Sequence, residues 1–202
     1  MRIVGLLYLT FLLGITRAYG DCECLWQGSF ADVAKNTDLV VAGKVESVKG
    51  NSLDLALQRT LEGETDHPSV RVWLKTDDYC RPEAELFPEG SEWVMALSQI
   101  HEEVEGGFNP FTPNVSYGRV GDYYLSSCGG YWLGLNGEWV TGNLVEAPRW
   151  ARDPEMTPVL LDLLDDYLNG NLSAQALLDA SRADPVARDL MLDTKAFLRD
   201  SE

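Results

Sequence analysis

The sequence predicts a mainly β fold, arranged as a small barrel or sandwich and followed by C-terminal helices. Between residues 38 and 141, short apolar or alternating runs are separated by Gly, Pro, Asn and Asp, which is typical of a compact antiparallel sheet. After Pro148 the spacing of apolar residues changes to the period of amphipathic helices. The 202 residues, 45% of them hydrophobic, are enough for one domain with a sizeable core.

The first twenty residues have the pattern of a cleavable secretory signal. Arg2 precedes an apolar stretch over residues 3–15, and Ala18 and Gly20 form a small-x-small cleavage site. The stretch is shorter than the roughly 20 residues of a spanning helix, and no later segment is apolar enough to cross a bilayer. We therefore expect a signal peptide over residues 1–20, cleavage after Gly20, and a secreted or periplasmic protein that is not an integral membrane protein.

The charge excludes one class of partner. The chain has 16 basic and 32 acidic residues, a formal charge of −16. Loss of residues 1–20 removes Arg2 and Arg17, which leaves 14 basic residues against 32 acidic ones and a charge of −18. Such a surface repels the phosphates of nucleic acids, so no nucleic-acid partner is expected.

Seven strands are expected in the β region. Gly43 in the first strand indicates a bulge or a sharp bend, which suits closure into a barrel. Asn136-Gly137 predicts a two-residue hairpin turn between the last two strands, because both residues tolerate a positive φ. Trp132 and Trp139 in this hairpin are expected to pack in the core or across the strands. The expected strands are Leu39 to Val48, Ser52 to Leu61, Val70 to Thr76, Glu92 to Gln99, Gly121 to Ser127, Tyr131 to Leu135 and Glu138 to Thr141.

A long loop and three helices complete the expected elements. The loop lies between Ile100 and Tyr117, and its Phe108 and Phe111 either contact a partner or turn inward. The first helix extends from the Asp153-Pro154 pair to Leu168, with Gly170 just beyond its end. Weaker helical patterns cover residues 173–182 and 185–199.

Four cysteines, Cys22, Cys24, Cys80 and Cys128, allow three disulfide pairings. A bridge between Cys22 and Cys24 would be strained, so both are expected to pair with the later cysteines, in either of two ways. A four-thiolate zinc site is the competing interpretation. The chain lacks the paired C-x-x-C of zinc domains, and exported proteins meet an oxidising environment, so we expect disulfides and no metal.

The order of these features resembles a known family. Cys22-Glu-Cys24 is followed by the strand at 38–45, by 70–74 leading to Cys80, by 93–97, and by Tyr123-Tyr-Leu-Ser-Ser-Cys128. Over residues 22–128 the chain resembles the netrin-like domain of the tissue inhibitors of metalloproteinases. The resemblance implies an OB-fold-like five-stranded barrel over residues 21–148, a C-terminal helical segment over 149–202, and the bridges Cys22–Cys80 and Cys24–Cys128. The six further cysteines of those inhibitors are not present.

The resemblance also implies a function for the amino terminus. In the inhibitors, the amine and carbonyl of the first cysteine chelate the catalytic zinc of the target protease. Here that role would belong to Cys22, with Glu23, Cys24 and Leu25 entering the substrate cleft. The predicted cleavage leaves Asp21 in front of Cys22, and the resulting amide cannot chelate zinc in the same way.

The expected function is therefore a secreted netrin-like binding module whose partner is an extracellular or periplasmic protein or a carbohydrate. The alternative is a metalloprotease inhibitor that acts through the C-x-C segment. An enzyme is not expected, because the only histidines, His67 and His101, lie in polar loop contexts and no G-x-S-x-G, H-E-x-x-H or phosphate-binding glycine loop occurs. No catalytic residue and no cofactor are predicted.

Overall fold

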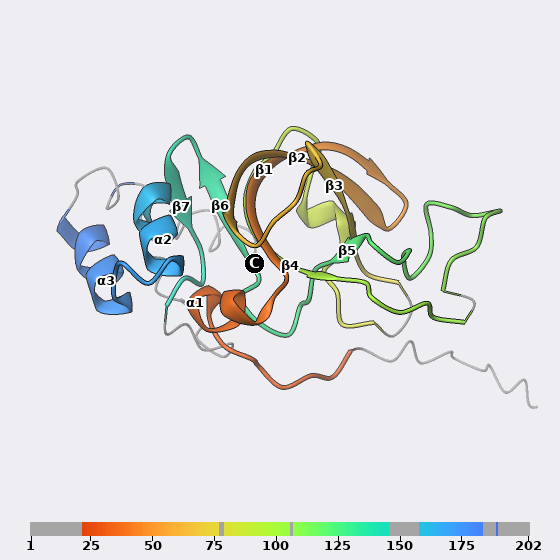
Figure 1. The fold of residues 1–202 in the computed structure, drawn as a ribbon, viewed down its shortest axis with the longest axis horizontal. Helices are drawn as coiled ribbons and strands as arrows, with labels where there is room; N and C mark the ends of the chain where they lie inside the picture. The colour runs from red at the N-terminus through yellow and green to blue at the C-terminus, as the bar shows by residue number, and fades with distance from the viewer. Residues whose placement is uncertain (1–21, 77–78, 106, 146–157, 184–188, 190–202) are drawn as a thin grey trace, which may run out of the picture.

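The computed structural model describes residues 22–76, 79–105, 107–145, 158–183 and 189 of the chain (Figure 1). These residues form a mainly β structure with short helices at the carboxyl end. The expected signal peptide and the expected helix at 185–199 lie outside the described residues, apart from residue 189. The elements are α1 (Phe30–Val33), η1 (Ala34–Asn36), β1 (Leu39–Lys49), β2 (Ser52–Glu62), β3 (Ser69–Trp73), η2 (Ala84–Leu86), β4 (Glu92–Gln99), β5 (Tyr123–Tyr124), β6 (Trp132–Asn136), β7 (Trp139–Thr141), β8 (Val159–Leu160), α2 (Leu161–Leu168) and α3 (Ala174–Ala183).

Five of the strands close into a barrel. The sheet order is β1-β2-β3-β5-β4, and β1 also pairs with β4. The β1 strand runs antiparallel to both of its neighbours, whereas β3 and β5 are parallel. The β6, β7 and β8 strands extend the sheet beyond β4. Of the two expected arrangements, barrel and sandwich, the chain therefore adopts the barrel.

Glycine at position 43 allows β1 to bend between its two partners. The β1–β2 register shifts between Ala42 and Gly43, the irregularity that the sequence predicts. A Cβ on Gly43 would lie 2.5 Å from the carbonyl oxygen of Ala56 and 2.9 Å from Cγ of Leu55. The backbones therefore approach more closely here than any side chain would permit.

Both faces of the first half of β1 are buried, which explains its continuous apolar run. Leu39 and Val41 belong to the cluster inside the barrel. Val40 and Ala42 belong to a second cluster on the outer face, beneath α1, β6, β7 and the C-terminal helices. The period-2 alternation of a strand thus assigns successive apolar residues to two different cores.

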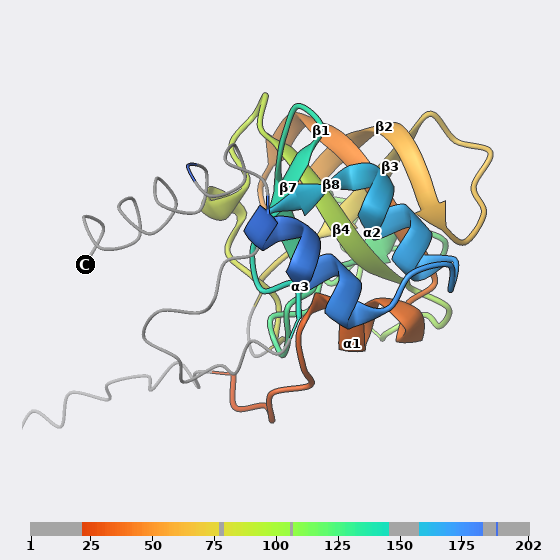
Figure 2. The same cartoon turned by 90° about the vertical axis from the view of Figure 1, so that its left-hand side faces the viewer.

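The C-terminal helices cover the outer face of the barrel (Figure 2). Leu164 of α2 and Leu177 of α3 are fully buried in the outer cluster. Arg59 of β2 forms ion pairs with Asp162 and Asp165, which join α2 to the barrel wall. Among the described residues, no helix is long and apolar enough to cross a membrane.

The expected start of the first C-terminal helix is wrong. Val159 and Leu160 were expected within that helix, yet they form β8 and pair with Val140 and Trp139 of β7. The helix begins only at Leu161. The edge of β7 offers unpaired backbone groups and the outer cluster accepts the Val159 side chain, so sheet pairing overrides the local helical period.

Two strands are shorter than expected. The β3 strand ends at Trp73 rather than Thr76, because the next amide, Leu74 N, donates to the carbonyl oxygen of Asn51 instead of to a strand. The β5 strand contains only Tyr123 and Tyr124.

The predicted hairpin is present. Asn136 pairs with Trp139, and Gly137 has a φ of 60°. Trp132 is half-buried, with its ring centroid 5.7 Å from that of Phe87 in an edge contact, as expected for a packed tryptophan. Trp139 is also half-buried.

We predict that Gly43→Ala destabilises the fold by about 2 to 3 kcal/mol, because the new methyl group overlaps the β2 backbone. The matched control is Gly134→Ala in β6, where the nearest atom to a new Cβ would be 3.7 Å away. Urea unfolding of both variants measures the difference. Equal stability of the two variants would contradict the role assigned to Gly43.

Candidate functional site at the disulfide-anchored amino terminus

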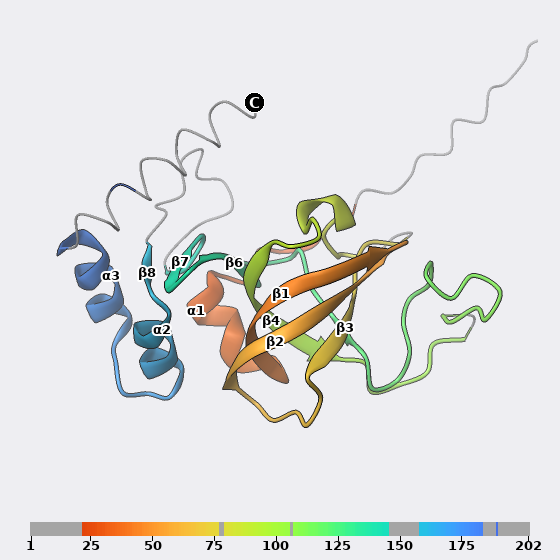
Figure 3. The same cartoon turned by 90° about the horizontal axis from the view of Figure 1, so that it is seen from above.

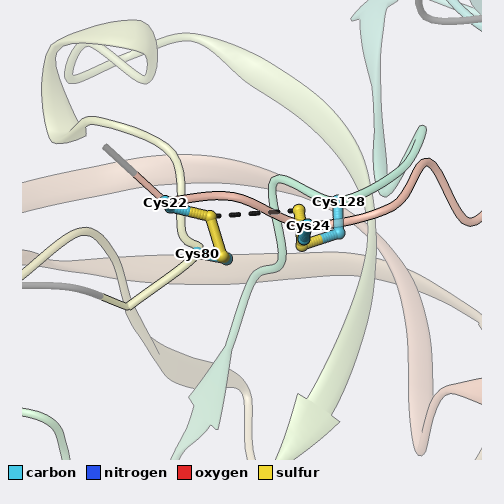
Figure 4. Close-up of side chains that lie close together, drawn as sticks. All are labelled: Cys22, Cys24, Cys80 and Cys128. Carbon is cyan, nitrogen blue, oxygen red and sulfur yellow. Dashed lines mark hydrogen bonds between the residues drawn. A yellow bond between two sulfur atoms is a disulfide. The ribbon is translucent and has the colours of Figure 1, made fainter. Parts of the chain in front are cut away.

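Two disulfides lie side by side next to the barrel (Figure 4). They join Cys22 to Cys80 and Cys24 to Cys128, with Cα–Cα distances of 5.2 and 5.8 Å. This is the pairing that the family resemblance implies. The four sulfur atoms lie within 4.8 Å of one another, and the Sγ atoms of Cys22 and Cys24 are 3.9 Å apart. All four sulfurs are used in the two bridges.

The N-terminal segment, defined here as residues 22–27, has no regular secondary structure, and its residues alternate between partly buried and exposed. Cys22 and Cys24 turn toward the barrel and are partly buried. Glu23, Leu25 and Gln27 turn outward and are exposed. The C-x-C spacing therefore fixes which residues of the segment remain available for contact.

Further contacts hold the end of this segment. The amide of Gln27 donates to the carbonyl oxygen of Cys128 at 2.8 Å. Just beyond it, the amide and hydroxyl of Ser29 donate to a carboxylate oxygen of Asp32 at 2.9 and 2.7 Å, in the manner of a capping box that starts α1. Phe30 follows and is fully buried. The segment is thus fixed by two disulfides and by the start of α1.

Leu25 is a large apolar side chain that is 90% exposed. A rigid backbone that presents an exposed leucine can insert this side chain into an apolar pocket of a partner at little cost in conformational entropy. Glu23, two residues earlier on the same face, adds a negative charge beside it. This arrangement suits contact with another macromolecule.

A cationic and aromatic cluster next to Cys80 was not predicted. The Arg81 side chain is only 5% exposed, and its guanidinium carbon lies 5.3, 4.4 and 4.8 Å from the ring centroids of Tyr79, Tyr117 and Tyr124. One of its amino groups donates to the carbonyl oxygen of Tyr117 at 2.6 Å. Burial lowers the pKa of Arg81 below its ordinary value, while the neighbouring tyrosines favour its charged form.

This cluster joins the surroundings of Cys80 to the β4–β5 loop, defined here as residues 100–122. Tyr117 belongs to the loop, whereas Tyr124 lies in β5 and Tyr79 precedes Cys80. Tyr79 and Arg81 flank Cys80, whereas Tyr117 and Tyr124 belong to a distant part of the sequence. Only the closure of the barrel brings them together.

The other residues named from sequence lie on the surface. The β4–β5 loop projects from the barrel (Figure 3), and its Phe111 is 93% exposed, so this ring does not turn inward. Phe108 is 37% exposed, with the guanidinium carbon of Arg119 5.7 Å from its ring centroid. His67 and His101 are exposed, and His101 Nε2 lies 3.4 Å from a carboxylate oxygen of Asp38.

We predict that removal of either disulfide by paired Cys→Ser substitution destabilises the protein by about 4 kcal/mol. The bridges span 58 and 104 residues, and the chain-entropy model gives a loss of this size for both, slightly larger for the longer one. Thermal or urea unfolding of the Cys22→Ser/Cys80→Ser and Cys24→Ser/Cys128→Ser variants measures it. A loss below about 1 kcal/mol for either pair would show that the bridge does not restrain the unfolded chain.

The site thus consists of a clamped segment with an exposed leucine, beside a buried arginine surrounded by tyrosines. No family model, no curated protein and no solved structure matches this chain.

Proposed function

We propose that this chain is an extracytoplasmic binding module of the netrin-like kind, and that the N-terminal segment is its contact surface for a protein partner. The observation that carries the proposal is the exposure of Leu25 on a backbone held by two disulfides. A segment fixed before binding loses little further entropy when the complex forms. The fixed N-terminal segment is therefore suited to binding a protein partner.

The strand arrangement supports an OB-type barrel. Five strands close in the order β1-β2-β3-β5-β4, with β1 paired on both of its edges and the parallel pair β3–β5 closing the circuit. Five-stranded barrels of this kind are common in binding proteins. The bridges from the C-x-C segment to Cys80 and Cys128 add support for the netrin-like identification.

The two disulfides support a location outside the cytosol. Disulfides persist in oxidising compartments and are rare where thiols are kept reduced. The signal pattern of residues 1–20 agrees with export. The formal charge of −16 favours a protein partner over a nucleic acid. Together with Glu23 beside Leu25, it also favours a partner surface that combines an apolar pocket with basic residues.

We predict that Leu25→Asp abolishes capture of the partner, because a carboxylate replaces the apolar contact. The measurement is photocrosslinking from a benzoylphenylalanine at Glu23, with the disulfide-intact protein incubated among the exported proteins of its own cell. The matched control is Val120→Asp, at an exposed apolar residue of the β4–β5 loop. Equal loss of the crosslinked species in both variants would place the contact surface elsewhere.

A second candidate function is inhibition of a zinc metalloprotease. The observation that favours it is the Cys22-Glu23-Cys24-Leu25 segment, in which both cysteines are bridged and Glu23 and Leu25 are exposed. Zinc ligation by this segment requires a free amine on Cys22, since an amide nitrogen is a far weaker ligand. The residue at which the mature chain begins therefore separates the two functions.

We predict that the exported chain begins at Asp21 and does not inhibit the catalytic domain of a matrix metalloproteinase. Intact mass and amino-terminal sequencing of the unreduced protein identify its first residue. A refolded chain that begins at Cys22 serves as the comparison in the same inhibition assay. Inhibition by the refolded Cys22 form alone would show that zinc binding depends on the free amine. If the exported chain itself begins at Cys22 and inhibits the protease, protease inhibition is the correct function.

A further inference from the structure

The four sulfur atoms of the two bridges lie close enough together to share one metal ion once the bridges are reduced (Figure 4). Among the described residues, they are the one group of cysteine, histidine and acidic side chains whose ligand atoms gather in this way. All four sulfurs lie within 4.8 Å of one another, and those of Cys22 and Cys24 are 3.9 Å apart. A zinc ion with thiolate ligands at about 2.3 Å holds these ligands about 3.8 Å apart, at the corners of a tetrahedron. The distance between Cys22 and Cys24 is already close to this value.

Only small movements separate the bridged arrangement from this tetrahedron. A disulfide holds its two sulfurs about 2.0 Å apart, so each bridged pair has to separate by about 2 Å after its bond is broken. Rotation about the Cα–Cβ bonds of the cysteines supplies a displacement of this size. The Cα–Cα distances of 5.2 and 5.8 Å allow both thiolates of a pair to reach one ion with little shift of the backbone.

Two backbone hydrogen bonds hold the cysteine-bearing segments together independently of the disulfides. The amide of Ser127 donates to the carbonyl oxygen of Cys80 at 3.0 Å, which joins the segments on either side of the parallel β3–β5 pair. The amide of Gln27 donates to the carbonyl oxygen of Cys128 at 2.8 Å, which joins the N-terminal segment to them. Neither bond involves a sulfur atom. Reduction of the bridges therefore leaves the four thiols assembled in the fold.

The group is accessible to an ion and selective for its type. Cys22, Cys24 and Cys80 are partly exposed, which gives an ion a path from solvent, whereas Cys128 is only 6% exposed. Thiolates in a tetrahedral arrangement favour zinc, while magnesium and calcium require oxygen ligands. The paired C-x-x-C of zinc domains is absent from this sequence, because here the strand pairing, and not a local motif, brings the ligands together.

We infer that the reduced chain binds one zinc ion through all four cysteines, and that oxidation releases the ion as the two disulfides form. Zinc replaces the four thiol protons when it binds. On oxidation, each cysteine pair passes two electrons to one molecule of oxidised glutathione, which leaves as two thiols, and the zinc ion departs with its charge unchanged. A newly synthesised chain carries its cysteines as thiols until it meets an oxidant, so the zinc form belongs to the stage before oxidation.

This inference does not rest on the proposed function. It concerns the sulfur atoms, whereas the protein-contact surface is formed by the exposed side chains of Glu23 and Leu25. The ion is held by the chain itself and is distinct from the zinc of a target protease. Zinc and the two disulfides would hold the same N-terminal segment in the reduced and in the oxidised protein.

The test uses the exported chain after reduction with a phosphine, which turns each disulfide into two thiols and becomes a phosphine oxide with oxygen from water. Cobalt(II) replaces zinc as a coloured probe, because a tetrahedral complex with four thiolates gives strong charge-transfer and visible bands. We expect one cobalt ion per chain, displaced by one zinc ion, with a Kd for zinc below about 1 μM at neutral pH. Oxidised glutathione should release the zinc, and the bridged protein should not bind it at this affinity.

Two variants and one spectrum make the test decisive. Cys24→Ser leaves three thiolates and should weaken zinc binding by more than the roughly 10- to 100-fold that loss of a residue supporting a ligand costs. The control His101→Gln removes an exposed imidazole that lies 3.4 Å from Asp38, and it should leave the Kd unchanged. The ¹⁵N NMR spectrum of the zinc form should keep the dispersed signals of the oxidised protein.

Three results would overturn the inference. The first is failure of the reduced chain to bind one equivalent of cobalt or zinc. The second is equal affinity of the Cys24→Ser and His101→Gln variants for zinc. The third is zinc binding with the NMR spectrum of an unfolded chain, since unfolded chains also bind metals through cysteines and the site would then not belong to the fold.

Discussion

The pairing of β1 with strands on both of its edges is the interaction on which the rest of the structure depends. It closes the barrel, and it separates the apolar residues of β1 into an inner and an outer core. A strand that pairs on both edges of a small barrel must bend and twist strongly. The bend brings its backbone so close to a neighbouring strand that no side chain fits between them. Gly43 lies at this point of close approach. Every surface discussed above is attached to this closed frame.

The closed barrel brings together residues that are far apart in the sequence. The cysteines at positions 22, 24, 80 and 128 meet because the ends of β3 and β5 are adjacent through their parallel pairing. The same adjacency positions Tyr117 and Tyr124 around Arg81. The long β4–β5 loop is held at its base by Asn51, at the turn between β1 and β2. The disulfides, the Arg81 contacts and the Asn51 hydrogen bonds thus fix the segments that the strand pairing brings together.

Much of this could be predicted from the sequence, and the limits have physical causes. The order of strands, the bend at Gly43, the hairpin at Asn136-Gly137 and the bridging of the amino terminus all follow from local chemistry that the fold retains. The strand at Val159 and Leu160 could not be predicted, since its pairing depends on an edge contributed by β7. For the same reason the sequence named the exposed residues of the C-x-C segment but missed Arg81. The significance of this residue lies in its burial and in its contacts with Tyr117 and Tyr124, and neither property leaves a local pattern.

The position of Arg81 couples the anchor of the amino terminus to the β4–β5 loop. Its neighbour Cys80 is bridged to Cys22, and its guanidinium group lies against the rings of Tyr79, Tyr117 and Tyr124. A planar guanidinium group can face several rings at once, whereas the compact ammonium group of lysine cannot. Even this conservative exchange would therefore loosen the surroundings of Cys80 and the end of the loop together.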